Sequence, residues 1–262
     1  MANPIVFRDL LKDSFDRARR LMGPSLPYAA IFILALGGMV WSAGVLPDGG
    51  TGFAAFSAIS FASIYAHSLF SASMYHVVLD HETGLMSAAW KLTLAWLLMI
   101  VIVSIGASII ILFFSLIGSS LGVVSGESSD NITDMAAQMR EGGTFWPLFA
   151  VFIATLFGVY WFMTRMMIFA AASATRGAVH VLRTWSWTKG QFRVLGPAMG
   201  LLIVAPLIVG SFIANFVAGA VFGTGPLSAP LTAAHSMLVM AILLPTAWIV
   251  HGFAASGYAW VA

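Results

Sequence analysis

Six long stretches of the chain are almost continuously apolar, and short polar segments separate them. A helix needs about 20 apolar residues to cross the hydrocarbon core of a bilayer, which is about 30 Å thick. Each stretch reaches this length, so the pattern predicts an all-α, polytopic transmembrane helical bundle of about six spans, forming a single membrane domain over residues 1–262. The predicted spans cover residues 26–46, 53–79, 92–124, 146–172, 196–222 and 231–260.

Two segments just before spans show another pattern, in which apolar and charged positions take opposite sides of a helix. Residues 1–25 and residues 176–195 both have this pattern, and both run directly into a span. A soluble surface helix has the same pattern, but a helix of this kind next to a span can lie in the headgroup region, with its arginines near anionic lipid. We therefore predict two interfacial amphipathic helices. The apolar face of the first consists of Phe7, Leu10, Leu11, Phe15, Ala18, Leu21 and Met22.

The composition supports a chain that lipid surrounds. Of its 262 residues, 60% are hydrophobic and 8% are charged, whereas a soluble domain carries roughly 25% charged residues. Such a chain lacks the polar side chains that a water-soluble surface needs. The sequence also has no cysteine, which excludes disulfides, thiolate metal sites and cysteine nucleophiles.

The distribution of positive charge predicts how the spans are oriented. Every lysine and arginine except Arg140 lies at the N-terminus or near the segments that follow spans two and four. Because cytoplasmic loops carry an excess of lysine and arginine, those segments and both termini are predicted to be cytoplasmic. The predicted interfacial helices then lie at the cytoplasmic surface, and the longest polar connection, residues 125–144, faces outward.

A short motif carries a resemblance to a known family. Residues 183–193 read Arg-Thr-Trp-Ser-Trp-Thr-Lys-Gly-Gln-Phe-Arg, Arg165 stands near the end of span four, and residues 80–84 precede an amphipathic turn. Together with the arginine-rich N-terminus, they resemble bacterial six-span inner-membrane proteins related to the membrane domain of glycerophosphodiester phosphodiesterases. The resemblance implies this architecture and a location in the bacterial inner (cytoplasmic) membrane. It brings no activity, because no catalytic residue of that enzyme has a counterpart here.

The sequence contains no recognisable catalytic motif. His-Glu-x-x-His, Gly-x-Ser-x-Gly and phosphate-binding glycine-rich patterns are all absent. Every Asp and Glu lies in a loop or at a helix end, which disfavours a proton relay based on carboxylates inside the membrane. We therefore expect no enzymatic activity and no cofactor.

A few ionisable residues lie at or inside the predicted spans. His76, Asp80 and His81 are a weak candidate for a metal site at the end of span two; a solvated helix end is the interpretation we favour, so no metal is predicted. Four residues are candidates for buried polar groups that bond between helices, and a haem ligand is the alternative for the histidines. Arg165 is expected at the cytoplasmic interface, with Asp80 or a lipid phosphate as its partner if it is buried. The four residues are Arg165, His67, His235 and His251.

The sequence favours a non-catalytic membrane protein that acts as an accessory subunit, scaffold or lipid-organising factor. Its expected partners are membrane lipids, anionic ones above all, and other integral membrane subunits, but not nucleic acid. The alternative is a transporter of a small solute or lipid, which the serine-rich face of span two and the kinks expected at Pro206 and Pro245 motivate. The side chains expected to contact headgroups or a partner are Arg17, Arg19, Arg20, Arg183, Lys189 and Arg193.

Overall fold

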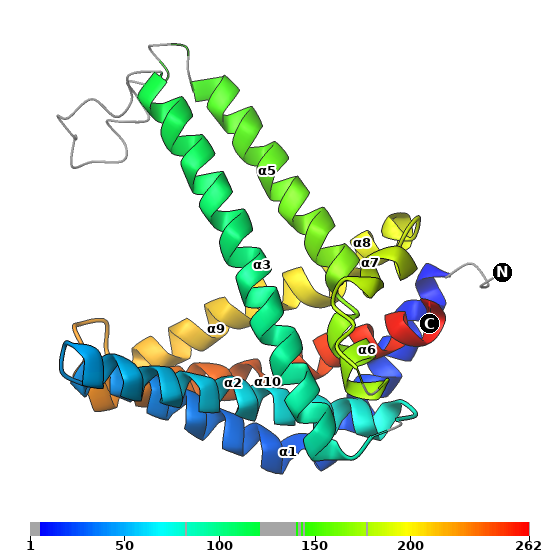
Figure 1. Ribbon diagram of the computed structural model, residues 1–262, viewed down its shortest axis with the longest axis horizontal. Helices are drawn as coiled ribbons and strands as arrows, with labels where there is room; N and C mark the ends of the chain where they lie inside the picture. The colour runs from blue at the N-terminus through cyan, green and yellow to red at the C-terminus, as the bar shows by residue number, and fades with distance from the viewer. Residues whose placement is uncertain are drawn as a thin grey trace. The chain divides into compact units, whose positions relative to one another are not determined.

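The computed structural model describes residues 6–81, 83–120, 140, 143, 145–176 and 178–261, and this part of the chain is helical without strands (Figure 1). The all-α prediction is confirmed. The helices are α1 (Phe7–Val45), α2 (Gly50–Val78), α3 (Leu85–Ser120), α5 (Phe145–Met166), α6 (Phe169–Thr175), α7 (Arg183–Trp187), α8 (Phe192–Met199), the π-helical turn η1 (Gly200–Val204), α9 (Ala205–Phe222) and α10 (Ala229–Val261).

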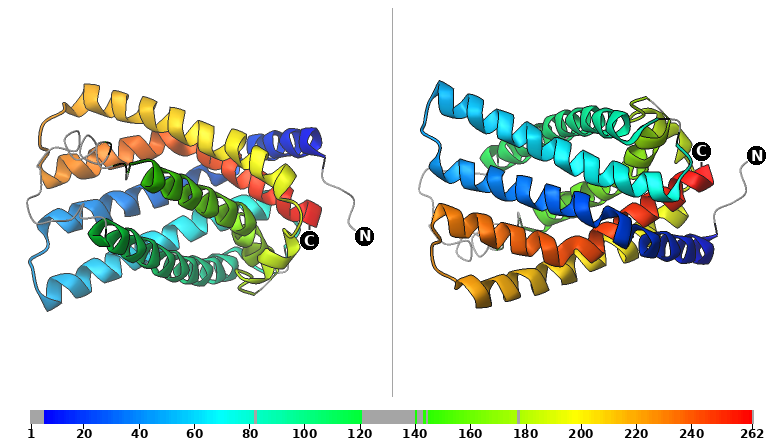
Figure 2. Two further views of the ribbon diagram at one scale, coloured as in Figure 1. Left: turned by 90° about the horizontal axis from the view of Figure 1, so that it is seen from above. Right: turned by 90° about the horizontal axis from the view of Figure 1, so that it is seen from below.

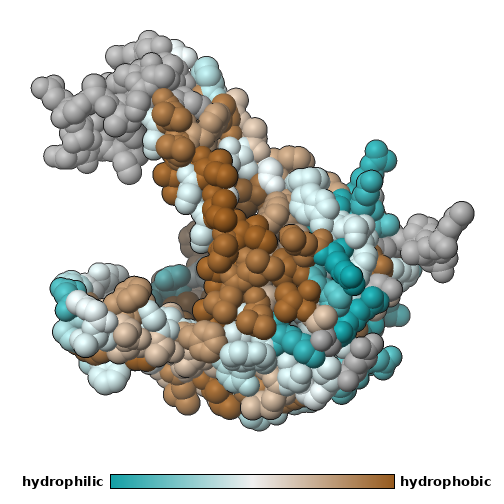
Figure 3. Space-filling model, viewed as in Figure 1, coloured by the Kyte–Doolittle hydropathy of each residue, from teal (hydrophilic) through white to brown (hydrophobic). Residues whose placement is uncertain are grey.

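Six helical segments among the described residues are long and apolar enough to cross a membrane. Many of their large hydrophobic side chains are exposed, and hydrophobic residues cover the length of α3 and α5 in Figure 3. A soluble protein rarely exposes apolar surface on this scale. The chain is a multi-pass membrane protein. The six segments are Phe7–Val45, Gly50–Val78, Leu85–Leu116, Phe145–Thr175, Phe192–Phe222 and Ala229–Val261.

The chain forms two compact units, which are described separately. The core unit comprises Met1–Leu97 and Thr164–Ala262, and the hairpin unit comprises Leu98–Met163. In the core unit, helices α2, α1, α10 and α9 lie side by side in that order (Figure 2). In the hairpin unit, an apolar groove of about 550 Å³ runs past Gly106 and Gly158. That the two units act as one membrane domain stays a prediction.

One stripe of α1 is buried along most of the helix. Its buried positions follow each other at intervals of four, four and three residues. An 11-residue repeat of this kind corresponds to about 3.67 residues per turn, close to the 3.6 of an α-helix, so the stripe stays on nearly one side. Two small residues separate each large residue from the next along it. The positions are Leu10, Ser14, Ala18, Leu21, Ser25, Ala29 and Phe32.

This stripe brings α1 against α10 at very short range. A Cβ atom added to Gly252 would lie 2.5 Å from the carbonyl oxygen of Ser14 and 2.9 Å from the amide nitrogen of Ala18. At the other end of the pair, a Cβ on Gly44 would lie 2.7 Å from the Cβ of Ala229. Between these points the indole N–H of Trp248 donates to the hydroxyl of Ser25 at 2.9 Å. Close approach and this hydrogen bond fix the α1–α10 pair.

The N-terminal amphipathic segment is helical, and it continues into span one without a break. Pro24 and Pro27 lie inside the continuous helix α1, so the N-terminal segment and the span form one element. Burial of the stripe on both sides of the prolines explains the continuity, since packing compensates for the free energy lost with the backbone hydrogen bonds that proline removes.

Residues 176–195 do not form one interfacial helix. They contain a non-helical stretch, the five-residue α7, a turn and the start of α8. The turn passes through Gly190, whose φ of +81° is a conformation that favours glycine. The alternation of apolar and polar residues in this segment therefore reflects a compact loop rather than a helix.

The expected span boundaries match the helices to within a few residues at most ends. Span three begins earlier, at Leu85, and residues 121–124 of its predicted range, like most of the predicted outer connection 125–144, lie outside the described residues. In span five the π-helical turn η1 comes directly before Pro206. A wider turn relieves the clash of a proline ring with the preceding turn. Pro245 lies inside α10, as expected.

The α1–α10 contact predicts how the chain responds to one added methyl group. Gly252→Ala should lower the free energy of unfolding by about 1–3 kcal/mol, because backbone atoms on α1 cannot move aside. Gly219→Ala is a matched control, since no heavy atom lies within 4 Å of its Cβ position. Thermal denaturation in mild detergent measures both; an equal loss in the two variants would contradict the close contact.

Candidate functional site: the basic end of the core unit

One end of the core unit gathers basic side chains from distant parts of the sequence. The first turns of α1 pack on the last turns of α10, and Trp187 of α7 lies 6.3 Å, ring to ring, from Tyr258 of α10. Hydrophilic residues gather at this end in Figure 3. We call it the basic end. Its exposed basic residues include five of the six predicted contact residues: Arg19, Arg20, Arg183, Lys189 and Arg193.

Arg17, the sixth predicted contact residue, is used inside the protein. Its Nε donates to the carboxylate of Asp13 at 2.8 Å, and its Nη1 donates to the carbonyl oxygen of Val78 at 2.6 Å. Val78 is the last residue of α2, where carbonyl groups have no partner in the helix. Arg17 thus ties the end of α2 to α1 and is poorly placed for a headgroup.

The motif at 183–193 builds the connection between the fourth and fifth spans. The hydroxyl of Thr188 donates to the carbonyl oxygens of Arg165 at 2.9 Å and of Thr184 at 3.0 Å. Gly190 then turns the chain into α8. The motif's small and aromatic residues therefore have structural roles, while Arg183, Lys189 and Arg193 point to the surface.

Arg165 is buried, and its described contacts lie within the protein. It is 6% exposed at the end of α5. Its guanidinium donates to the carbonyl oxygen of Trp185 and lies 4.8 Å from the centre of the Trp185 ring. Asp80 is exposed. A carbonyl oxygen and an aromatic face stabilise a cation where solvent is scarce.

Arg176 has a similar role, which the sequence analysis missed. Its Nε donates to the hydroxyl of Tyr258 at 2.6 Å, and its guanidinium carbon lies 4.9 Å from the ring centre of Trp187 and 5.5 Å from that of Tyr258. The signal available in the sequence was the repeated Arg-then-Trp order, Arg165 with Trp185 and Arg176 with Trp187. Without the fold, neither arginine could be assigned to its tryptophan.

His251 joins α10 to α2. Its Nδ1 lies 2.7 Å from the carbonyl oxygen of Ala247, and its Nε2 lies 2.9 Å from the hydroxyl of Ser71. A carbonyl oxygen only accepts, so we assign the hydrogen to Nδ1, which leaves Nε2 to accept from Ser71. His251 is therefore a buried group that bonds between helices, and this use of both nitrogens leaves no lone pair for a haem iron.

The other two histidines of the spans lie among aromatic rings. The ring of His67 lies 5.0 Å from Phe32 on α1 and 5.2 Å from Trp96 on α3. His235 is half-buried, with its ring 5.9 Å from that of Phe222. These contacts pack the core unit.

The geometry of His76 and His81 disfavours the weak metal candidate. Their rings are nearly parallel, 20° apart, with centres separated by 3.9 Å. A metal ion lies in the plane of each imidazole that binds it, and two stacked planes cannot both contain one ion. Among the described residues no group of three or more His, Asp or Glu side chains could hold a metal ion.

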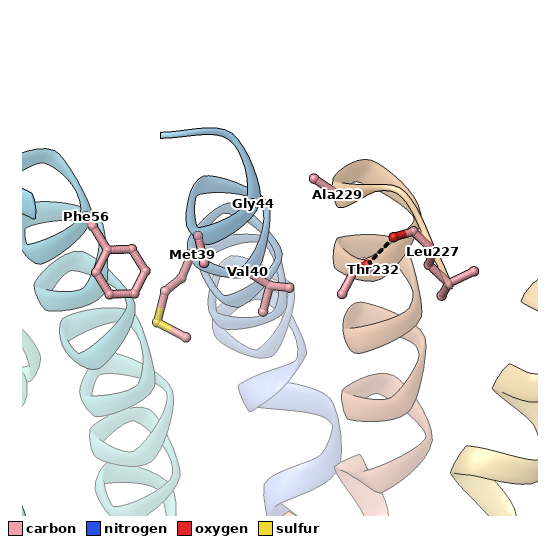
Figure 4. Close-up of a pocket in the computed structure, with 8 residues that line it drawn as sticks. Met39, Val40, Gly44, Phe56, Leu227, Ala229 and Thr232 are labelled. Atoms are coloured by element: carbon pink, nitrogen blue, oxygen red, sulfur yellow. Dashed lines mark hydrogen bonds between the residues drawn. The ribbon is translucent and has the colours of Figure 1, made fainter. Parts of the chain in front are cut away.

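A cleft opens at the opposite end of the core unit, across the last turns of α1 (Figure 4). Its volume is about 520 Å³. Phe56 of α2 stands on one side, Met39 and Val40 of α1 lie in the middle, and the start of α10 forms the other side. Thr232 provides a polar group of the cleft on α10, and its hydroxyl already donates to the carbonyl oxygen of Ser228 at 3.0 Å. The cleft therefore offers little polar recognition.

No family model, curated protein or solved structure matches this chain. The assignment of a function therefore depends on the chemistry of the basic end, where buried and exposed arginines have separate roles.

These roles predict unequal effects of two neighbouring substitutions. Arg17→Met removes the bond to the Val78 carbonyl and should lower the free energy of unfolding by about 1–2 kcal/mol. Arg20→Met removes an exposed side chain and should change it by less than about 0.5 kcal/mol. Thermal denaturation in detergent compares the two variants, and a larger loss for Arg20→Met would overturn the assignment.

Proposed function

We propose that this chain is a non-catalytic protein of the bacterial inner membrane that holds anionic lipid at its cytoplasmic face and acts there as a scaffold or accessory subunit. The observation that supports this most is the division of the basic residues. Arg17, Arg165 and Arg176 bond within the protein. The exposed ones, such as Arg19 and Arg193, form no ion pair with the described acidic residues.

Exposed arginines next to membrane spans suit lipid phosphates. A basic side chain near an anionic leaflet contributes about 1 kcal/mol of attraction, and guanidinium groups bind phosphate oxygens through paired hydrogen bonds. The basic end contributes such side chains from α1, α7 and α8. Several cations spread over three helices favour an extended lipid surface over one small anion.

The inner-membrane location and the cytoplasmic termini are supported by two arguments from the sequence. One is the excess of basic residues on one side of the spans. The other is the resemblance of residues 183–193 to six-span inner-membrane proteins. A role without catalysis is supported by the lack of a recognisable catalytic motif in the sequence.

A transporter is the weaker alternative. Three of the serines of α2 bond within the protein: Ser68 donates to the carbonyl oxygen of Ile64, Ser73 donates to that of Phe70, and Ser71 bonds His251. Bonds of this kind satisfy the hydroxyl groups within or between helices and leave fewer of them to line a path for solute.

Charge reversal at the basic end tests the lipid proposal. The double variant Arg19→Glu/Arg20→Glu, purified from micelles that contain equal phosphatidylglycerol and phosphatidylcholine, should retain about tenfold less phosphatidylglycerol, because two attractive charges become repulsive. Native mass spectrometry of the bound lipids measures the change. Arg140→Glu, the same change at an exposed residue of the hairpin unit, is the control. Unchanged lipid retention in the double variant would reject the proposal.

The proposed orientation has its own test, helped by the absence of native cysteine. Asp48→Cys and Lys189→Cys each place one thiol at an exposed position on opposite ends of the core unit. A membrane-impermeant maleimide added to intact cells should label Asp48→Cys and spare Lys189→Cys until the cells are opened. Labelling of Lys189→Cys in intact cells would show that the orientation is opposite to the proposed one.

A further inference from the structure

The first turns of α1 present three distinct stripes to their surroundings. One is the buried stripe, to which Leu10, Ala18 and Leu21 contribute at 0%, 3% and 0% exposure. The apolar face expected from the sequence is therefore divided, because Phe15 and Met22 are 45% and 41% exposed. These two side chains are available for a contact outside the described chain.

Phe15 and Met22 belong to a second stripe, which we call the α1 strip. Its members follow each other at intervals of four and three residues, so they lie on one side of the helix. All six are exposed. The composition changes along it, from basic residues far from the span to apolar residues beside it. The α1 strip consists of Arg8, Lys12, Phe15, Arg19, Met22 and Leu26.

The acidic residues of α1 lie on a third stripe. Asp9, Asp13 and Asp16 are again four and three residues apart, about 100° around the helix from the α1 strip. Arg20 follows on this acidic stripe, four residues after Asp16. The α1 strip thus carries three cations and no carboxylate, whereas its neighbour carries every acidic group of the helix.

We propose that the α1 strip is the surface that enters the anionic leaflet, with Met22 and Leu26 among the upper acyl segments, Phe15 at the boundary, and Arg8, Lys12 and Arg19 at lipid phosphates. This inference rests on the proposed lipid function and names the surface that performs it. Charge complementarity selects the occupant, since phosphates attract the basic stripe while the acidic stripe turns toward water. The end of the strip beside the span consists of the apolar residues Met22 and Leu26, which matches the position of the acyl layer.

A cysteine scan in the otherwise cysteine-free chain tests the placement. Single variants Phe15→Cys, Met22→Cys, Asp9→Cys and Asp16→Cys receive a spin label, in nanodiscs of phosphatidylglycerol and phosphatidylcholine. Labels at positions 15 and 22 should collide readily with oxygen dissolved in the lipid. Their collision rate with a water-soluble nickel chelate should be at least about fivefold lower than that of labels at positions 9 and 16. Equal access of the chelate at all four positions, or shielding from both reagents at 15 and 22, would overturn the inference; the latter would indicate a protein partner.

Single charge reversals separate this inference from the broader proposal. Arg19→Glu should lower phosphatidylglycerol retention about fivefold, while Arg20→Glu, on the acidic stripe, should lower it less than twofold. Equal losses in the two single variants would reject the α1 strip and leave the lipid function in place. No loss in either single variant or in the double variant would reject both.

Discussion

The close approach of α1 and α10 is the contact on which the rest of the core unit depends. Lipid tails are as apolar as the side chains of the spans, so burial of apolar surface does little to hold two helices together in a bilayer. Contact at van der Waals distance remains, and it requires small residues. Gly252 lies directly against the α1 backbone at Ser14 and Ala18. This contact sets the separation at which Trp248 reaches Ser25 and places His251 of the same helix beside Ser71 of α2.

The arginines of the basic end illustrate how environment decides the role of one residue type. Arg165 is surrounded by protein, so its charge must be compensated by the Trp185 carbonyl and ring. Arg17 lies at a helix end whose carbonyl groups need donors, and it provides one to Val78. Arg19, a short distance along the same helix, is exposed. The same guanidinium chemistry thus stabilises the fold in the first two cases and remains available to lipid in the third.

The continuity of α1 connects membrane contact to packing. Since α1 passes through Pro24 and Pro27 without interruption, the stripe that packs on α10 and the stripe proposed to enter the leaflet belong to one continuous helix. An interfacial helix joined to its span by a flexible loop would move independently of the bundle. Here a lipid contact at the first turns of α1 would act on the tilt of the α1–α10 pair.

The sequence by itself determined the number and approximate bounds of the spans, because length and apolarity are local properties of each segment. It also identified the basic residues as a group. Only the tertiary structure decided which of them bond within the protein, since the partners of Arg17 and Arg176 lie 61 and 82 residues away in the chain. The same holds for the prolines of α1, where packing against α10 outweighs the local tendency to begin a new helix. It also holds for residues 176–195, where Trp185 and Trp187 contact Arg165 and Arg176. Where local patterns permit several conformations equally, contacts between distant segments determine which one the chain adopts.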